Sequence, residues 1–417
     1  MANPAKKILF ISYDGITDPL GQSQVIPYLQ GLSLHGYQIF LLSCEKEAVY
    51  QQNKTGVEQL LKGYNIQWLP LNYTKNPPVL STLIDIIKLR KAAKKIHREH
   101  SIDMVHTRPG VPALVGLWMK KKTGVKFLND IREFYADSRV EGGMWNTRNP
   151  LYKIIYNFFK RKEKEGVELS DGIVCLTYAA EKIIQQWPEY KKNIPLEVIP
   201  CSADLALFDP AKIDANKKDE LKKELNISAG DLIVSYLGSI GGWYLTAEMM
   251  QFCKLLSDKK RAVKFLFISP HRHDEIVAAA AKYGVSPEKI VTKKAGRQDV
   301  PVLLSLSDYA VFFIKPCYSK QSSSPTKHGE IMAMGIPLIT NSGVGDVKEV
   351  VLKYNSGIVL DEFTEPAFAA AVDKIVAGYN YDAAGIRQGA KEFYSLDSAI
   401  EKYNKIYGEI FKDYRSF

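Results

Sequence analysis

The sequence has little that would mark a membrane-spanning, secreted or repetitive protein. None of its uninterrupted apolar runs approaches the ~18 residues that a membrane-spanning helix needs. The segment Met1–Lys7 leads directly into a strand-like run, Ile8–Ile11, without the pattern of a cleavable signal. Internal repeats and low-complexity tracts are absent as well. We therefore expect a globular, cytoplasmic protein.

Cysteine is scarce, which argues against a zinc ribbon or a disulfide framework, because both need paired spacing. The five cysteines are scattered, and several fall in apolar, strand-like runs: Cys44, Cys175, Cys201, Cys253 and Cys317. We expect buried thiols. The run His271–Asp274 alternates metal-ligand types in a polar loop without nearby partners, which makes a poor metal site. The sequence therefore predicts no bound metal and no cofactor.

The chain of 417 residues is long enough for two domains, because single hydrophobic cores rarely grow past ~250–300 residues. Short, β-rich apolar runs recur with room for a helix between them, and their continuous apolar character suits parallel strands covered on both faces. The first series comprises Ile8–Ser12, Ile39–Ser43, Ile66–Leu71, Met104–His106, Lys126–Leu128, Gly172–Leu176 and Leu196–Ile199. The second comprises Leu232–Leu237, Lys264–Ile268, Lys289–Val291, Ala310–Ile314, Pro337–Thr340 and Gly357–Leu360. These runs predict two doubly wound α/β domains with parallel sheets.

Two prolines bound a segment without clear periodicity, Pro200–Pro210, which we interpret as an interdomain hinge. We place the first domain at residues 1–202, the hinge at 203–212 and the second domain at 213–395. Apolar residues recur at helical spacing in the tail, where we expect a helix over 396–417. Ligands bind beyond the carboxyl ends of parallel strands, so two such sheets facing each other would hold a ligand in the cleft between them.

The segment 324–337 breaks a local rule at the start of a predicted helix. We interpret Ser324 as the N-cap and Pro325 as the first residue of a short helix over Thr326–Met334, which glycine and proline then end. Lys327 places a cation in the first turn, where the helix dipole favours a carboxylate by roughly 0.3–1 kcal/mol. An anion held at this helix N-terminus by free N–H groups and by Lys327 would explain that choice.

Glu330 lies three residues after Lys327, on the same side of the predicted helix. A carboxylate beside an anion site is well placed to accept hydrogen bonds from sugar hydroxyls. The alternative is a surface ion pair between Glu330 and Lys327 on an exposed helix face, worth about 0.3–0.5 kcal/mol. From the residues alone both interpretations remain open.

This segment resembles the donor-site helix of the family 4 retaining glycosyltransferases, which have the GT-B fold. In that family a glutamate before a small-residue, Gly-x-Pro ending holds the ribose of a nucleotide sugar, and Glu330 matches that glutamate. The resemblance covers nearly the whole chain and is to bacterial polysaccharide-type members. It implies two Rossmann-like domains facing across a cleft, with the last helix crossing back to the first domain. It also implies metal-independent transfer, with retention, of a sugar from a nucleotide donor such as a UDP- or GDP-sugar to an acceptor hydroxyl.

Glycine-rich loops follow the first strand of each predicted domain. The spacing of Gly15 and Gly21 fails the dinucleotide-binding fingerprint Gly-x-Gly-x-x-Gly, which argues against a plain NAD dehydrogenase. In the second domain, Gly238 and Ser239 follow the strand. We expect both loops to bring backbone amides close to the donor. An ordinary strand-to-helix turn is the alternative for the first loop.

Three positions depart from the pattern of the family. Many members have arginine, lysine and glutamate where this chain has Ser239, Tyr244 and Ser322. Neutralisation of the leaving diphosphate is therefore assigned to Lys327, with Arg297 as the second candidate. The predicted donor-binding residues are Gly15, Gly21, Gly238, Ser239, Arg297, Ser324, Thr326, Lys327 and Glu330.

Charged residues also gather after the predicted strand Lys126–Leu128, where Asp130 and Arg132 resemble the first-domain loop that faces the acceptor in the family. Loop ion pairs explain such crowding equally well. His106 and Arg108, just after another strand, are further acceptor-side candidates. The predicted catalytic residues are Lys327, Glu330, Asp130 and Arg132.

The formal net charge is +10, and basic residues concentrate at 88–98, 120–122 and 160–164. A helix over Leu83–His97 would carry a stripe that is apolar at one end and basic at the other, formed by Leu83, Ile86, Ile87, Arg90, Lys94 and His97. This stripe is either a solvated helix face or a surface for peripheral contact with an anionic membrane. Nucleic acid is not expected as a partner, because the basic runs lack interleaved aromatic residues.

The sequence thus predicts a glycosyltransferase that acts on a glycan, glycolipid or small-molecule acceptor. Two alternatives belong to other classes. A sugar-nucleotide epimerase with the GT-B fold would convert the donor without an acceptor. A pseudo-enzyme would bind the nucleotide sugar without turnover, and the departures at Ser322, Ser239 and Tyr244 favour that interpretation.

Overall fold

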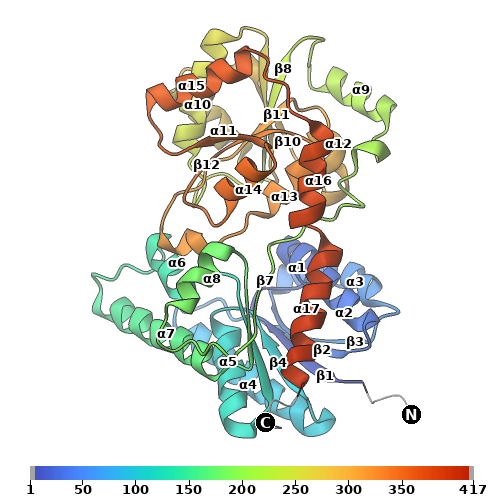
Figure 1. The fold of residues 1–417 in the computed structure, drawn as a ribbon, viewed down its shortest axis with the longest axis vertical. Helices are drawn as coiled ribbons and strands as arrows, with labels where there is room; N and C mark the ends of the chain where they lie inside the picture. The colour runs from blue at the N-terminus through green and yellow to red at the C-terminus, as the bar shows by residue number, and fades with distance from the viewer. Residues whose placement is uncertain (1–4, 413–417) are drawn as a thin grey trace. The chain divides into compact units, whose positions relative to one another are not determined.

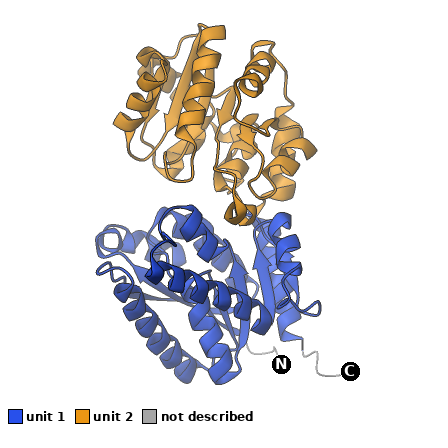
Figure 2. Cartoon of the chain, turned by 90° about the vertical axis from the view of Figure 1, so that its left-hand side faces the viewer, with its two compact units in different colours: residues 1–200, 396–417 blue, residues 201–395 orange. Residues whose placement is uncertain are grey.

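A computed structural model describes residues 5–412, which form two compact units. Among the described residues, unit 1 comprises 5–200 and 396–412, and unit 2 comprises 201–395 (Figure 2). The segment 203–212, which we predicted as a separate hinge, lies in unit 2, because Ala203 and Phe208 are buried in the core of that unit. The ends of the predicted first domain and of the predicted last helix, residues 1–4 and 413–417, lie outside the described residues.

Unit 1 contains a seven-stranded parallel sheet in the order β3-β2-β1-β4-β5-β6-β7 (Figure 1). Its strands are β1 (Lys7–Ser12), β2 (Gln38–Glu45), β3 (Ile66–Asn72), β4 (Met104–Thr107), β5 (Lys126–Ile131), β6 (Gly172–Cys175) and β7 (Leu196–Val198). Its helices are α1 (Pro19–Gln24), α2 (Ile26–Leu34), α3 (Glu47–Leu61), α4 (Leu80–His100), α5 (Val111–Thr123), α6 (Tyr135–Glu141), α7 (Pro150–Leu169), α8 (Tyr178–Gln185) and α17 (Leu396–Phe411).

Helices cover both faces of this sheet, as its continuous apolar strands predict. Successive residues of β1 alternate between two cores: Ile8 and Phe10 pack with α2 and α17, whereas Leu9 and Ile11 pack with α4 and α5. The close approach of α17 to α2 requires Gly31, because a Cβ there would lie 2.3 Å from Ile400 of α17. The C-terminal helix therefore belongs to the core of unit 1, although the whole of unit 2 precedes it in the chain.

Unit 2 contains a six-stranded parallel sheet in the order β10-β9-β8-β11-β12-β13. Its strands are β8 (Leu232–Leu237), β9 (Val263–Ile268), β10 (Ile290–Lys293), β11 (Tyr309–Val311), β12 (Leu338–Asn341) and β13 (Gly357–Leu360). Its α-helices are α9 (Ala215–Glu224), α10 (Thr246–Lys259), α11 (His273–Lys282), α12 (Val300–Leu304), α13 (Thr326–Ala333), α14 (Val347–Lys353), α15 (Glu365–Val376) and α16 (Ala383–Phe393). Short 3₁₀ turns are η1 (Pro210–Lys212), η2 (Pro287–Lys289), η3 (Arg297–Asp299) and η4 (Tyr318–Ser322).

The predicted fold class is confirmed, because every predicted apolar run forms a strand of one of two parallel sheets. The boundaries differ by a few residues, most importantly in β5. That strand continues to Ile131, so Asp130 lies within the sheet and not in a loop after it. In the described part of the chain, none of the helices combines the length and hydropathy needed to cross a bilayer.

Candidate functional site

Each sheet has one point at which the strand order reverses, and ligands of doubly wound folds bind beyond the carboxyl ends of the strands at that point. In unit 2 the reversal lies between β8 and β11. Gly238 directly follows β8, and the next α-helix after β11 is α13. The topology therefore brings the second glycine loop and the N-terminus of α13 to the same edge of the sheet, where the sequence analysis placed the donor.

Helix α13 begins one residue later than predicted. Pro325 occupies the N-cap position with extended backbone angles, and no side chain caps the helix. The N-cap assignment of Ser324 was therefore wrong, since its hydroxyl accepts a hydrogen bond from the backbone N–H of Cys201 (3.2 Å). Thr326 is the first helical residue. Its donor-binding role, like that of Ser324, stays a prediction.

The amine of Lys327 is buried among aromatic rings at the start of α13. Lys327 is only 7% exposed. Its Nζ atom lies 3.3 Å from the hydroxyl of Tyr236 and 3.8 Å from the ring centre of Tyr244. Among residues 5–412 no carboxylate lies within 4.0 Å of this amine. Burial lowers the pKa of Lys327 to about 7, and the nearby charge of Glu330 only partly offsets that effect. The alternative of an exposed Lys327–Glu330 pair on a solvated helix face is therefore wrong.

Glu330 is equally buried and forms its ion pair with Arg297. Nη1 of Arg297 donates to Oε1 of Glu330 at 3.0 Å. Burial raises the pKa of Glu330, while the Arg297 guanidinium acts in the opposite direction. The Arg297 side chain is 37% exposed, so the pair reaches the surface on the arginine side. Lys327 and Glu330 thus leave the same face of α13 toward different neighbours, the lysine toward Tyr236 and Tyr244 and the glutamate toward Arg297.

Gly238 gives the Lys327 amine the space it occupies. Its φ of +116° is a conformation that residues with a side chain rarely adopt, and an added Cβ would lie 2.9 Å from Nζ of Lys327. The amide of Gly238 already donates to the carbonyl of Ile268 at 2.9 Å. The backbone carbonyl of Ser239 accepts a hydrogen bond from the hydroxyl of Tyr236. Gly238 therefore serves the lysine directly and does not offer a free amide to a phosphate.

Sequence reasoning missed two features of this loop. Arg272 reaches it from the N-terminal end of α11, where Nη1 donates to the carbonyl of Ile240 at 2.9 Å. Its guanidinium also pairs with Glu275. Tyr244, which replaces the lysine common in the family, has its ring against the Lys327 amine. Only the fold brings these positions together, and no local pattern signals either contact.

The reversal of strand order in unit 1 lies between β1 and β4. The loop with Gly15 follows β1, and Arg108 directly follows β4. Gly21 lies inside α1, where a Cβ would be 2.5 Å from the carbonyl oxygen of Gly15. This glycine is needed for the close approach of α1 to its own loop. A direct role of Gly15 or Gly21 in donor binding stays a prediction.

A buried carboxylate accepts the hydrogen bonds of loop amides that we expected to face the donor. Glu45, at the end of β2, accepts hydrogen bonds from the amide of Ile16 (2.8 Å), the amide of Thr17 (3.2 Å) and the hydroxyl of Thr17 (2.6 Å). The hydroxyl of Ser43 adds a fourth at 2.6 Å. Glu45 is 1% exposed, so the anion of this loop is part of the protein itself.

Replacing Glu45 with glutamine should destabilise unit 1 by about 1.5–3 kcal/mol, because hydrogen bonds to a charged acceptor are replaced by weaker ones and an amide N–H₂ is turned toward donors. Urea unfolding of the wild type and of Glu45→Gln measures the difference. Glu47→Gln, two residues along the chain and on the surface, is the matched control. Equal unfolding midpoints for the three proteins would contradict the assignment.

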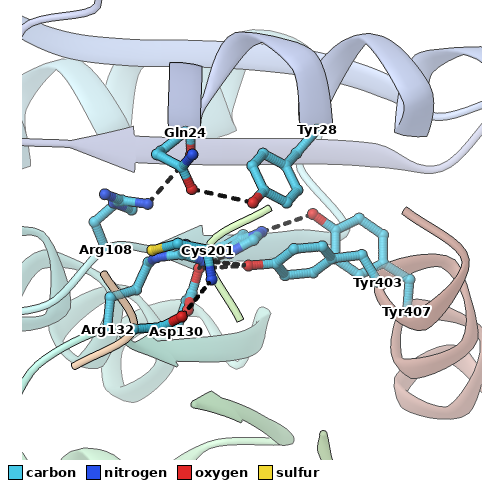
Figure 3. Close-up of polar contacts among 10 residues, drawn as sticks. Gln24, Tyr28, Arg108, Asp130, Arg132, Cys201, Tyr403 and Tyr407 are labelled. Atoms are coloured by element: carbon cyan, nitrogen blue, oxygen red, sulfur yellow. Dashed lines mark hydrogen bonds and ion pairs between the residues drawn. The ribbon is translucent and has the colours of Figure 1, made fainter. Parts of the chain in front are cut away.

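The acceptor-side candidates of unit 1 form a buried polar network with α17 (Figure 3). The hydroxyl of Tyr403 donates to Oδ2 of Asp130 at 2.8 Å, and Nη1 of Arg132 donates to the Tyr403 oxygen at 3.0 Å. His106 lies between Asp130 (3.3 Å) and the hydroxyl of Tyr407 (2.7 Å). Arg108 contacts the carbonyl of Gln24 at 3.4 Å. The sequence analysis predicted these side chains without foreseeing that α17 supplies their partners.

The protonation states in this network follow from burial and from the neighbouring charges. Burial alone would raise the pKa of Asp130, but Arg132, His106 and Arg108 together lower it to about 2. Burial lowers the pKa of His106, against the opposing effect of Asp130. The network therefore joins an ionised carboxylate and a neutral imidazole at neutral pH. Asp130, Arg132 and His106 hold the C-terminal helix in place, and their acceptor-side role stays a prediction.

Comparisons with known proteins agree with this geometry. Residues 217–392, which contain Lys327, Glu330 and the glycine loop, match the model of the glycosyl transferases group 1 family. The chain carries a group 1 glycosyltransferase domain.

A curated relative of this chain is the alpha-monoglucosyldiacylglycerol synthase of Streptococcus pneumoniae, 21% identical over 60% of this chain. The match spans only 54% of that relative, about half its length. Among solved structures, a glycosyltransferase from Rickettsia africae has a TM-score of 0.73 at 16% identity and covers 99% of this chain and 100% of its own. HepE from Anabaena, solved with UDP and glucose, has a TM-score of 0.70 at 12% identity, covering 97% and 99%. These structures show that the chain has the GT-B fold, with one Rossmann-like domain in each unit.

Proposed function

We propose that this protein is a glycosyltransferase that moves a sugar, with retention and without a metal ion, from a nucleotide-sugar donor to a hydroxyl of a glycan or lipid-linked acceptor. The observation that carries the proposal is the buried Lys327 amine, which lacks a carboxylate partner among the described residues and lies beside the glycine loop. A buried cation without a counter-ion is costly, so an anionic ligand that arrives beside it gains a strong interaction. The diphosphate of a UDP- or GDP-sugar is such a ligand.

In this proposal Lys327 and Glu330 of α13 contact different parts of the donor. Lys327 neutralises the charge that develops on the departing diphosphate, in a site where aromatic rings keep the effective dielectric constant low. Glu330 accepts hydrogen bonds from the ribose hydroxyls, and the Arg297 guanidinium opposes the rise that burial causes in the pKa of Glu330. An oxygen of the departing phosphate takes the proton of the acceptor hydroxyl. In this scheme no protein nucleophile is needed.

Two comparisons support the choice of donor and acceptor. HepE was solved with UDP and with glucose, which supports a uridine diphosphate donor. The Streptococcus relative is named for the synthesis of a glucosylated diacylglycerol, which supports a lipid-linked acceptor. Peripheral contact with an anionic membrane would bring the protein to such an acceptor.

A thermal-shift panel of UDP- and GDP-sugars tests the proposal first, because a ligand that binds only the folded state raises its apparent stability. The active donor is then incubated with and without candidate acceptors, and the products are separated by mass spectrometry. We expect one nucleotide sugar to raise the melting temperature and to release its nucleotide diphosphate only when an acceptor is present. Conversion of the donor alone to an isomer would identify an epimerase instead, and binding without turnover would identify a pseudo-enzyme.

A further inference from the structure

Helix α4 has an exposed stripe whose chemistry changes along its length. Its first two turns expose Leu80 (52%), Leu83 (52%), Ile84 (37%) and Ile87 (52%). On the same face, the following turns expose Lys91, Lys94, Lys95 and Arg98. The stripe predicted from the sequence included Ile86 and Arg90, which was wrong, because Ile86 is buried in the core and Arg90 packs over the ring of Trp118.

Helix α7 repeats this design. It exposes Leu151 (51%), Ile154 (66%) and Phe158 (38%) at helical spacing, and Arg161 follows on the same face. Met144, in the loop before α7, is also 53% exposed. Soluble proteins rarely gather this many large apolar side chains on a surface without a partner.

The fold brings the two apolar segments to the same edge of unit 1. A helix that connects parallel strands runs back along the sheet and begins near the carboxyl ends of the strands. Both α4 and α7 pack on the same face as α5, which contacts each of them (Figure 1). Their exposed apolar halves therefore lie at the carboxyl edge, where Arg108 and the loop with Gly15 also lie, and their basic ends point away from it.

Unpaired lysines distinguish the basic end of α4 from the other basic clusters among the described residues. Lys120 pairs with Asp171, Lys121 with Glu165, and Lys160 with Asp137. For Lys91, Lys94 and Lys95, in contrast, no carboxylate lies within 4.0 Å among residues 5–412. These three cations remain available to an external anionic surface.

We propose that the exposed faces of α4 and α7 form one docking surface for an anionic lipid bilayer. Aliphatic side chains at the carboxyl edge enter the interface, and the free lysines of α4 contact the lipid headgroups. The acceptor-side edge of unit 1 then meets the membrane, so that a lipid-linked acceptor reaches it without leaving the bilayer. The inference deepens the proposed function and rests on it for the nature of the acceptor.

Vesicle flotation tests this surface with the full chain and without any enzymatic assay. The wild type should float with vesicles of phosphatidylcholine and phosphatidylglycerol and not with phosphatidylcholine alone. Ile84→Glu/Ile87→Glu and Ile154→Glu/Phe158→Glu should each weaken binding more than about tenfold, because each removes apolar insertion and adds repulsion. Lys91→Gln/Lys94→Gln should weaken it about fivefold or more per lysine, and high salt should do the same to the wild type.

The matched control is Leu352→Glu, a 63% exposed apolar position in unit 2, which should leave flotation unchanged. Light scattering without vesicles measures whether the protein dimerises, because a second copy of the chain is the alternative partner for this surface. A dimer that the α4 variant dissociates, flotation that ignores the phosphatidylglycerol, or equal binding by all variants would overturn the proposal. Nucleotide-sugar binding by the same samples is measured in parallel, so that failure of the membrane surface and failure of the proposed function give different results.

Discussion

Replacing Lys327 with methionine should lower turnover by roughly 10²–10³-fold, the usual effect of removing one preorganised group that stabilises charge in a transition state. Donor affinity should fall less, because the amine acts most strongly on the charge that develops as the diphosphate leaves. Steady-state and single-turnover kinetics with the active donor and acceptor measure both quantities. Lys218→Met, at a half-buried lysine elsewhere in unit 2, is the control and should retain normal kinetics. Equal losses in turnover and affinity would assign Lys327 to ground-state binding instead.

The pH dependence of donor binding follows from the lowered pKa of Lys327. In the free protein this amine loses its proton near pH 7, whereas a bound diphosphate would raise its pKa. Binding above pH 7 must therefore take up a proton, and affinity should fall by up to about tenfold per pH unit until the pKa of the complex is reached. Titration calorimetry in two buffers with different ionisation enthalpies detects that proton. Lys327→Met should bind with no such pH dependence between 7 and 9.

The substitution Lys327→Met should lower activity but raise the stability of the folded protein. The folded-state pKa of Lys327 is lower than its unfolded value, so between about pH 7 and pH 10 the unfolded chain binds the extra proton and stability rises with pH. At and below neutral pH the buried charge costs stability. Lys327→Met should therefore be more stable than the wild type at neutral pH while it loses activity, a trade typical of functional groups. A lower melting temperature would show that the amine is structurally required.

Replacing Glu330 with alanine should weaken nucleotide binding by about 1.5–3 kcal/mol, the scale of hydrogen bonds to a charged acceptor. Only 7% of the residue is exposed, so a nucleotide would reach its carboxylate in a largely desolvated site. Calorimetric titration with the nucleotide diphosphate measures this effect without turnover. An unchanged dissociation constant would count against Glu330 as the ribose-binding group.

Two further variants separate the direct contact of Glu330 from its ion pair. Arg297→Ala removes the partner at 3.0 Å and leaves the carboxylate in place. If Glu330 binds the ribose itself, Arg297→Ala should cost less affinity than Glu330→Ala. Glu330→Gln keeps the shape and one acceptor oxygen, and should recover part of the loss. Identical effects of all three substitutions would instead point to the ion pair as a purely structural contact.

The strands and their division between two domains could be predicted, because both depend on the local pattern of apolar residues along the chain. Continuous apolar runs such as Leu232–Leu237 leave little choice when both faces of a sheet are covered. Lys327 was predicted as a site residue for a related reason, since a cation in the first turn of a helix contradicts the local electrostatic preference. Conflicts of this kind are expected at functional positions, so Lys327 is the first residue to test.

The contacts that were missed join residues far apart in the chain. Glu45, on the neighbouring strand β2, accepts hydrogen bonds from the loop amides of Ile16 and Thr17. Tyr403 reaches Asp130 over 273 positions of sequence. Nothing in the local sequence distinguishes a glycine loop that awaits an anion from one whose anion is an internal carboxylate. Such partners become visible only when the register of the strands and the placement of α17 are known.

A crystal structure of the protein with a bound UDP- or GDP-sugar tests the central claim most directly. The account predicts diphosphate oxygens within hydrogen-bond distance of the Lys327 amine and ribose hydroxyls on the Glu330 carboxylate. A nucleotide bound elsewhere, with Lys327 still enclosed by Tyr236 and Tyr244 and Glu330 bonded only to Arg297, would contradict it.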